Sequence, residues 1–260
     1  MELSKLIALY DQDQRRAVEY ATTRREVTPR VVRHLDTTSP RTGAIIYSDL
    51  DESNVEETIR EEVRYFESLG RTLEWKVYDH DRPADLKDRL ERYGFKIEEV
   101  EAIMVLDLEE APSLLWEPVG GDVRRITDPQ DLPDVFSVQQ QVWDEDFSWL
   151  ENNLGRSLQE HPDQTSVYVA YVDARPACSA WMFLPRHSQF ASLWGGSTVS
   201  EFRKRGLYTA LLAARAQEAR ARGRRFLTVD ASEMSRPIQE RFGFVRIAWS
   251  WPCKWGEEER

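Results

Sequence analysis

The sequence is poor in cysteine and histidine, and this limits the chemistry open to it. Its 260 residues include two cysteines, Cys178 and Cys253, and four scattered histidines. Because the histidines lack the close spacing of metal ligands, we expect no metal site. Two cysteines in a chain without an apparent export signal favour two separate thiols over a disulfide.

Long apolar runs and excess positive charge are also missing. The chain runs from Met1 into Asp11, Asp13, Arg15 and Arg16 without an apolar stretch of membrane-spanning length. We therefore expect no signal peptide, no membrane partner and a cytoplasmic location. A net charge of -11 argues against a nucleic-acid partner, because phosphate backbones attract positive surfaces. Monomer and homodimer both remain open.

The sequence does contain enough apolar and aromatic residues for a substantial core. Hydrophobic residues make up 41% of the chain, with 9 Trp and 10 Phe. This length suits one large domain or two small ones. The turn-rich segment 111–121 has little periodicity and is predicted to be a linker between domains 1–110 and 122–260.

Helical and strand-like patterns alternate in both parts, which predicts layered α/β structure. In the first part we expect helices near 5–22, 54–69 and 84–92, and strands near 30–35, 44–48, 73–78 and 102–108. In the second part we expect helices near 132–142, 206–222 and 237–241, and strands near 123–126, 166–172, 177–183, 189–199, 226–229 and 246–255.

The two parts repeat one another. The motif at 91–95, Glu-Arg-Tyr-Gly-Phe, matches Glu-Arg-Phe-Gly-Phe at 240–244, so that Gly94 and Gly243 lie 149 residues apart. The long helices that precede them end at Gly70 and Gly223, which lie 153 residues apart. Similar offsets in the same order predict a duplicated module.

The basic stretch 203–205 is the strongest functional signal. Arg203, Lys204 and Arg205 precede a helix that opens at Gly206. The first amides of a helix have no partners within it, and together with the positive end of its dipole and nearby cations they form an anion site. The other interpretation is a solvated basic turn. The first half has Asp49, Asp51 and Glu52 at the corresponding place, and these carboxylates would repel a phosphate.

The run from Arg203 to Tyr208 resembles the Q/R-x-x-G-x-G/A loop of the GNAT superfamily of N-acetyltransferases. A strand precedes it, and a helix, a strand, a short helix and Gly243-Phe244 follow it, in that family's order over residues 121–260. The first half resembles a degenerate second copy, as in tandem members. The resemblance implies the acyl-CoA N-acyltransferase fold in two copies, an α/β (α+β) structure with a mixed, mostly antiparallel sheet flanked by helices.

The same resemblance implies acetyl-CoA as co-substrate. Its pyrophosphate would meet the loop and helix start, and its pantetheine arm the end of the strand before them. The implied cofactor-binding residues are Thr198, Val199, Arg203, Lys204, Arg205, Gly206, Leu207, Tyr208 and Thr209.

Two positions depart from the family pattern. Tyr208 stands where Gly or Ala is usual, although its side chain can point away from the phosphates. Gln239 stands where many relatives carry the tyrosine that protonates the departing thiolate, and an amide cannot act as that acid. The energetic cost of lacking this acid is limited, because the departure of an unprotonated thiol of pKa ~8.5 near pH 7 costs about 2 kcal/mol. Ser232, water or another hydroxyl is then the candidate proton donor.

The acceptor side is less defined. Direct transfer needs a neutral amine, and Asp230, at the end of its strand, is a candidate base, although a strand-end carboxylate is also a common cap. The acceptor-pocket candidates Trp143, Asp144, Glu145 and Asp146 combine an aromatic ring with carboxylates, which suits a cationic amine. The same residues also fit a charged loop with core aromatics.

These observations favour an N-acetyltransferase that moves an acetyl group to a primary amine of a small molecule by direct transfer in a ternary complex. The alternatives are an acyltransferase with another acyl group or acceptor, and a CoA-binding sensor or interaction module without catalysis.

Overall fold

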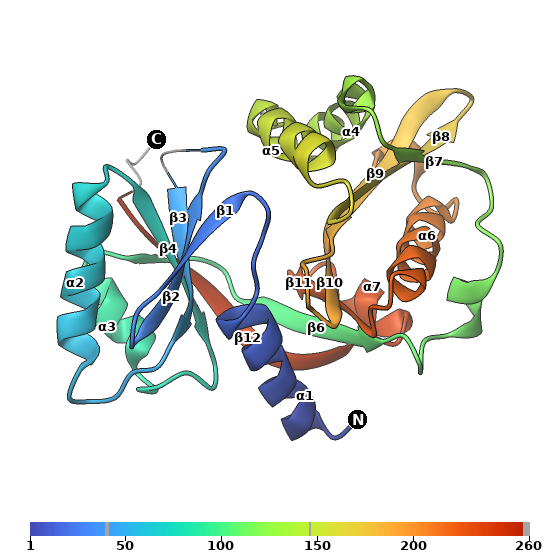
Figure 1. Cartoon of the computed structure of the whole chain (residues 1–260). Coiled ribbons are helices and arrows are strands. Elements are labelled where there is room, and N and C mark those ends of the chain that lie inside the picture. Colours follow the sequence, from blue (N-terminus) through green and yellow to red (C-terminus); the bar gives the residue numbers. More distant parts are fainter. Residues whose placement is uncertain (40–41, 146, 257–260) are drawn as a thin grey trace. The chain divides into compact units, whose positions relative to one another are not determined.

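The computed structural model describes residues 1–39, 42–145 and 147–256, which form two compact units (Figure 1). Unit 1 contains residues 1–104, 230–241 and the C-terminal residues from 245. Unit 2 contains residues 105–229 and 242–244. Each unit is therefore built from segments that lie far apart in the sequence.

Unit 1 is a mixed sheet covered by helices. Its strands lie in the order β1-β2-β3-β4-β12-β6, and the short β5 also pairs with β12. The β3–β4 pair is parallel, and β1–β2, β2–β3, β12–β4 and β12–β5 are antiparallel. The strands are β1 Thr23–Val27, β2 Val31–Asp36, β3 Thr42–Ser48, β4 Thr72–Tyr78, β5 Lys96–Ile97, β6 Glu101–Asp107 and β12 Val245–Trp255.

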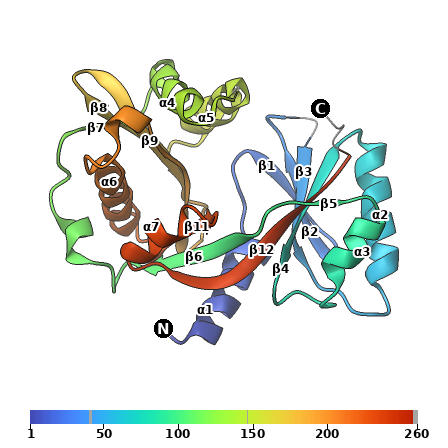
Figure 2. The same ribbon diagram turned by 180° about the vertical axis from the view of Figure 1, so that it is seen from behind.

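The helices of unit 1 place their apolar residues against its sheet. Helices α2 (Val55–Ser68) and α3 (Leu86–Arg92) lie on the same side of the β1–β4 sheet (Figures 1 and 2). Ile59, Phe66 and Leu90 from these helices pack on the sheet and are fully buried. The N-terminal helix α1 (Leu3–Tyr10) continues into a π-helix, η1 (Asp11–Arg16), and the short α7 (Arg236–Arg241) also belongs to this unit.

The last strand of the chain completes the sheet of unit 1. β12 pairs with β4 over six residues, from Ser250 opposite Tyr78 to Trp255 opposite Leu73. Its Cys253 is fully buried in the core of this unit. A strand at the end of the predicted second domain, 122–260, therefore pairs with a strand of the predicted first domain.

The strands of unit 2 are also mixed in direction and lie in the order β6-β11-β10-β9-β8-β7. Its β10–β11 pair is parallel, and β7–β8, β8–β9 and β9–β10 are antiparallel. Strands β6 and β11 contribute their ends at 105–107 and 226–229 to this unit. The strands are β7 Asp122–Ile126, β8 Thr165–Val172, β9 Arg175–Phe183, β10 Phe190–Thr198 and β11 Phe226–Ala231.

Alternating residues of this sheet face helices on its two sides. Val167, Val169 and Trp181 pack with α4 (Pro133–Trp143) and α5 (Ser148–Glu160). Tyr168, Ala170 and Ala180 pack with α6 (Leu207–Ala221). Figures 1 and 2 show α4 and α5 on one side of β8 and β9 and α6 on the other. The 3-10 helices η3 (Pro129–Asp131) and η4 (Ser200–Phe202) precede α4 and α6.

The predicted fold class is confirmed, and most predicted elements are found within a few residues. Helix α5 and strands β1 and β5 were not predicted. Asn152, Asn153 and Gly155 weaken the helical signal of α5, yet Leu150, Leu154 and Leu158 recur every four residues and are buried. The helix expected at 5–22 is shorter, because α-helical hydrogen bonding ends at Tyr10 and η1 ends at Arg16.

Two further expectations concern the cysteines and the linker. Cys178 and Cys253 are both free, as predicted, and both are buried. The predicted linker 111–121 includes a 3-10 helix, η2 (Ser113–Trp116). Gln217 of α6 donates hydrogen bonds to the carbonyls of Leu115 and Glu117. The segment is part of unit 2 and is held to α6 by these bonds.

The buried His34 of β2 should make stability depend on pH. Burial, assisted by Arg25, lowers its pKa from 6.5 to about 4, and the ring is 5% exposed. The unfolded chain takes up this proton near pH 6.5, whereas the folded chain does so only near pH 4. The free energy of unfolding should therefore fall as the pH drops through this window, by about 2 kcal/mol at pH 5 relative to pH 8.

Urea unfolding at several pH values tests this. His34→Gln should flatten the pH dependence, and the exposed His187→Asn should leave it unchanged. An unaltered slope in His34→Gln would refute the assignment.

Candidate functional site

Strand β10 bends at a bulge next to the predicted site. Its register with β9 shifts between Trp194 and Ser197. Gly195 lies there with φ 60, and a Cβ at this position would lie 1.7 Å from the ring of Trp181. Only glycine fits this position, because both the backbone conformation and the adjacent indole exclude a side chain.

The parallel pairing of β10 with β11 is short. Its three registered pairs run from Phe190–Phe226 to Ser192–Thr228, and β10 continues to Thr198. Within the described residues, the later part of β10 is registered only with β9. Backbone groups on the β11 side of this part of β10 are therefore available for other partners.

Helix α4 is fastened to the bulge by a buried polar network. Gln139 donates to the carbonyl of Gly195 at 2.7 Å and to the Ser179 hydroxyl at 2.9 Å, and accepts from the Ser197 hydroxyl at 3.1 Å. The indole N–H of Trp143 donates to Ser197 Oγ at 3.0 Å. The network holds one end of α4 against β10.

The loop after β10 reaches helix α6 through two residues with positive φ. Lys204 has φ 62 and Gly206, the residue that opens α6, has φ 79. No side chain of the described residues caps this helix, and a Cβ on Gly206 would meet nothing within 4 Å. The helix start is thus sterically open, with its first amides and the positive dipole end available to an anion.

The three cations of this loop are not equivalent. Arg203 Nε donates to the carbonyl of Thr198 at 3.2 Å, which fastens the loop to the end of β10. The Arg205 guanidinium lies 5.9 Å from the centre of the Phe202 ring. Lys204 and Arg205 are exposed. The predicted cofactor-binding residues, all within 198–209, lie on one continuous segment of unit 2 that runs from the end of β10 through the loop into α6.

Tyr208 points into the protein. Its ring lies beside Gly196, where a Cβ would come within 2.9 Å of it, and 6.1 Å from the Phe242 ring. Its side chain also hydrogen-bonds Arg215, whose pKa is lowered by burial. The family's small residue is therefore replaced here by a ring that packs against the bulged strand.

The turn before the corresponding helix in unit 1 is held by its own side chains, although Asn54 at the start of α2 makes no side-chain capping bond. Asp51 accepts hydrogen bonds from the amide and hydroxyl of Ser53, at 2.8 and 2.6 Å. Asn54 Oδ1 accepts from the amide of Asp51 at 3.1 Å. Carboxylate charge and local bonding thus occupy the turn before α2, in contrast to the turn before α6.

Sequence reasoning missed Arg15, which fills the corresponding part of the unit 1 sheet. Registered β3–β4 pairs end at Ile45–Trp75, and Arg15 Nε donates to the carbonyl of the next residue, Ile46. The guanidinium bonds both oxygens of Asp81 and lies 3.7 Å from the centre of the Tyr78 ring. Burial acts to lower its pKa, but Asp81 and its other partners raise it. No local motif indicates this role.

The catalytic candidates Asp230 and Ser232 lie in unit 1, not with residues 198–209 in unit 2. Asp230 accepts a hydrogen bond from Lys76, which also binds Glu101 at 3.0 Å. Burial acts to lower the pKa of Lys76, but the Asp230 and Glu101 carboxylates raise it. Ser232 and Ser235 hydroxyls lie 3.3 Å apart at the start of α7, and Gln239 of α7 is buried.

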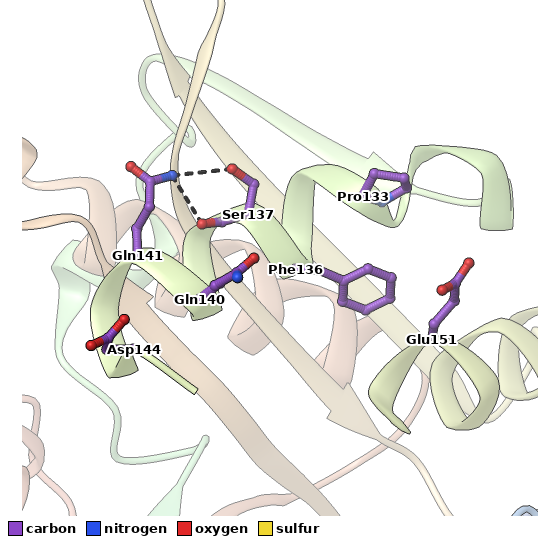
Figure 3. Close-up of a pocket in the computed structure, with 7 residues that line it drawn as sticks. All are labelled: Pro133, Phe136, Ser137, Gln140, Gln141, Asp144 and Glu151. Atoms are coloured by element: carbon purple, nitrogen blue, oxygen red, sulfur yellow. Dashed lines mark hydrogen bonds between the residues drawn. The ribbon is translucent and has the colours of Figure 1, made fainter. Parts of the chain in front are cut away.

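The acceptor-pocket candidates lie where α4 ends. Trp143 is 52% exposed, Asp144 caps the helix with φ 54, and Glu145 is exposed. Asp146 lies outside the described residues. Asp144 lines a pocket of about 580 Å³ between α4 and α5 (Figure 3). The pocket is lined by Pro133, Phe136, Ser137, Gln140, Gln141, Asp144 and Glu151.

Two general properties follow from the described part of the chain. None of its helices is both long and apolar enough to span a bilayer. Its histidine, cysteine and carboxylate side chains form no group of three or more that is arranged to hold a metal ion.

Comparison with solved structures identifies the fold. A GCN5-related N-acetyltransferase from Kribbella flavida matches with TM-score 0.70 and 14% identity, over 98% of this chain and 96% of that one. A tandem GNAT protein from the clavulanic acid biosynthesis pathway matches with TM-score 0.63 and 14% identity, over 98% and 94%. A GCN5-related N-acetyltransferase from Sphaerobacter thermophilus matches with TM-score 0.58 and 12% identity, over 88% and 81%. No family model and no curated protein matches the sequence.

The chain therefore has the GNAT acyltransferase fold. Its match over nearly the full length of a tandem protein shows that this fold is present in the tandem arrangement. The fold expected from the loop and the tandem arrangement expected from the repeat are confirmed.

The Gln139 network supports a stability prediction. Gln139→Met removes the bonds to Ser179, Ser197 and Gly195 and leaves buried polar atoms unpaired, which should lower the free energy of unfolding by roughly 2 kcal/mol. Gln141→Met, on the exposed side of the same helix, should change it by less than about 0.5 kcal/mol. Chemical denaturation measures both, and equal effects would contradict the role of the network.

Proposed function

We propose that this protein is an N-acetyltransferase that transfers the acetyl group of acetyl-CoA to a primary amine of a small molecule. The open start of α6 carries the proposal. It combines a left-handed Gly206, unobstructed space, exposed Lys204 and Arg205, and no side-chain cap among the described residues. An anionic group as large as a pyrophosphate fits this combination of space, amides and charge.

The neighbouring strand supports the same assignment. Beyond Ser192, β10 is registered only with β9 within the described residues, so an extended ligand has the β11 side of β10 to bind. At its end the Thr198 carbonyl already accepts from Arg203, and Val199 bonds Ala177 and Phe202 through its main chain. The proposed contacts to acetyl-CoA are thus the end of β10 for the pantetheine arm, and residues 203–209 for the phosphates. Arg203 contributes by fastening this loop to Thr198.

Only the second copy is proposed to bind acetyl-CoA, and we keep the predicted 122–260 as its domain. In unit 1 the turn before α2 is acidic and self-bonded, and Arg15 occupies the place beyond the last registered β3–β4 pair. Both features oppose a polyphosphate ligand with an extended arm.

In the proposed reaction the neutral amine nitrogen attacks the thioester carbon and forms a carbon–nitrogen bond. The carbon–sulfur bond then breaks, and CoA leaves as a thiolate that takes up a proton. The proton released by the amine passes to a base, for which Asp230 is the candidate, and Ser232 is a candidate donor to the thiolate. Aromatic and acidic residues at the end of α4, from Trp143 to Asp146, are proposed to receive the amine.

One prediction separates the two copies. Arg205→Glu should weaken acetyl-CoA binding roughly ten- to hundredfold, because it places a negative charge at the proposed phosphate site. Asp51→Ala should leave binding unchanged. Isothermal titration of both variants with acetyl-CoA provides the measurement, and equal effects would exclude a single site in the second copy.

A second prediction concerns proton transfer. If Asp230 is the base, Asp230→Asn should lower kcat for amine acetylation by about a hundredfold or more. Glu101→Gln is the matched control, because it also removes a carboxylate from Lys76 but keeps Asp230. A similar loss of kcat in both variants would show that Asp230 has a structural role and is not the base.

The alternative, a CoA-binding protein without catalytic activity, gives a different result when CoA release is measured. A CoA-binding sensor would bind acetyl-CoA but release no CoA with any amine in a broad panel. Its basis is the buried Gln239 at the position of the missing tyrosine.

A further inference from the structure

The described part of each unit contains an arginine whose side chain is buried. Arg15 in unit 1 and Arg215 in unit 2 are each 1% exposed and are among the largest fully buried side chains of the protein. A guanidinium stays charged in a protein, so each arginine places a positive charge in an interior that solvates it poorly. The two units differ in how they compensate this charge.

In unit 1 the charge of Arg15 is cancelled by carboxylates. The guanidinium bonds the two oxygens of Asp81 at 2.7 and 2.8 Å, and an oxygen of Asp11 at 2.8 Å. Burial acts to lower the pKa of Arg15, but these two carboxylates raise it. The positive charge is therefore compensated within unit 1.

In unit 2 the partners of Arg215 are neutral. Its Nε donates to the carbonyl of Leu211 at 3.1 Å, its Nη1 donates to the carbonyl of Trp181 at 3.3 Å, and its side chain also bonds that of Tyr208. None of the described Asp and Glu side chains forms an ion pair with it, and its Nη2 atom has no hydrogen-bond partner among the described residues. Neutral oxygens satisfy donors without cancelling a charge, so the charge of Arg215 stays uncompensated.

Arg215 extends along α6 toward the start of this helix. Its partners Leu211 and Tyr208 precede it by about one and two helical turns. Its third partner, Trp181, is registered with Trp194 where the bulge of β10 begins. The guanidinium therefore lies next to the bulge and within roughly 10 Å of the first amides of α6.

We propose that Arg215 is a buried cation of the anion site at the start of α6, and that the phosphates of the ligand supply its missing counter-charge. The exposed Lys204 and Arg205 are screened by water and salt, whereas a charge in the interior is screened much less. At roughly 10 Å a buried unit charge changes the affinity for a phosphate about tenfold. This inference rests on the proposed function, because the anion site is the same one.

The charge is tested with two variants of Arg215 in the full-length protein. Isothermal titration with acetyl-CoA and with inorganic pyrophosphate should show about tenfold weaker binding of both probes by Arg215→Gln, which keeps a hydrogen-bond donor but loses the charge. Arg215→Lys keeps the charge and changes the hydrogen bonds, and it should bind both probes within about threefold of the unmodified protein. A purely structural role would weaken binding in both variants.

Arg222→Gln is the matched control. Arg222 follows α6, and Glu218 already compensates its charge at 2.6 Å. Its affinity for both probes should therefore equal that of the unmodified protein. Equal losses in Arg215→Gln and Arg215→Lys, or unaltered affinity in Arg215→Gln, would overturn the inference.

A second pair of variants changes the charge balance without replacing Arg215, and it decides the question if Arg215→Gln does not fold. Cys178 is buried and interacts electrostatically with Arg215. Cys178→Asp should therefore reproduce the compensation seen in unit 1 and weaken pyrophosphate binding about tenfold. Cys178→Ser is neutral, keeps a partner for the Thr198 hydroxyl and should leave the affinity unchanged. Equal pyrophosphate affinity in these two variants would contradict a role for the charge.

The two probes separate this inference from the proposed function. Binding of both acetyl-CoA and pyrophosphate that depends on the charge of Arg215 supports both. Pyrophosphate binding that depends on this charge, without acetyl-CoA binding, would refute the proposed function and retain Arg215 in an anion site. Acetyl-CoA binding that is unaffected by Arg215→Gln would refute only the role of Arg215, and binding of neither probe would refute both.

Discussion

The pairing of β12 with β4 is the interaction on which the rest of unit 1 depends. Its six registered pairs join residues 172 to 182 positions apart in the sequence, and the pairing places Cys253 in the core. The end of β6, which closes the first half of the sequence, lies in unit 2, where Asp107 binds Arg225 at 2.8 Å. Each compact unit thus contains residues from both halves of the sequence.

The second organising constraint is the short parallel ladder in each unit. β3–β4 has four registered pairs and β10–β11 has three, and in both units the first strand continues beyond them. A strand that loses its neighbour must satisfy its backbone groups in another way. In unit 1 Arg15 from η1 bonds the first carbonyl beyond the ladder, and its charge is compensated by Asp81 and Asp11. The Arg15 side chain is 1% exposed, so it forms part of the core of unit 1.

The turns that lead from β3 into α2 and from β10 into α6 also differ between the two units. The turn before α2 satisfies its amides with Asp51 and Asn54, whereas α6 begins at a left-handed glycine preceded by exposed cations. The turn before a helix can be held by its own side chains or left open to an external anion. The first arrangement favours stability and the second favours binding.

The sequence by itself determined the features that depend on local pattern. The repeat at Gly94 and Gly243, the basic loop before Gly206 and the alternation of helices and strands led to the GNAT fold in tandem, because capping residues, glycine positions and apolar periodicity are local signals. Helix α5 was missed, since its buried leucines are interrupted by poor helix formers. Only the tertiary structure revealed the exchange of β12 and β6, the burial of Arg15, the Lys76–Asp230 pair and the pocket between α4 and α5. These features join residues that are distant in sequence, and such contacts leave no periodic trace in the chain.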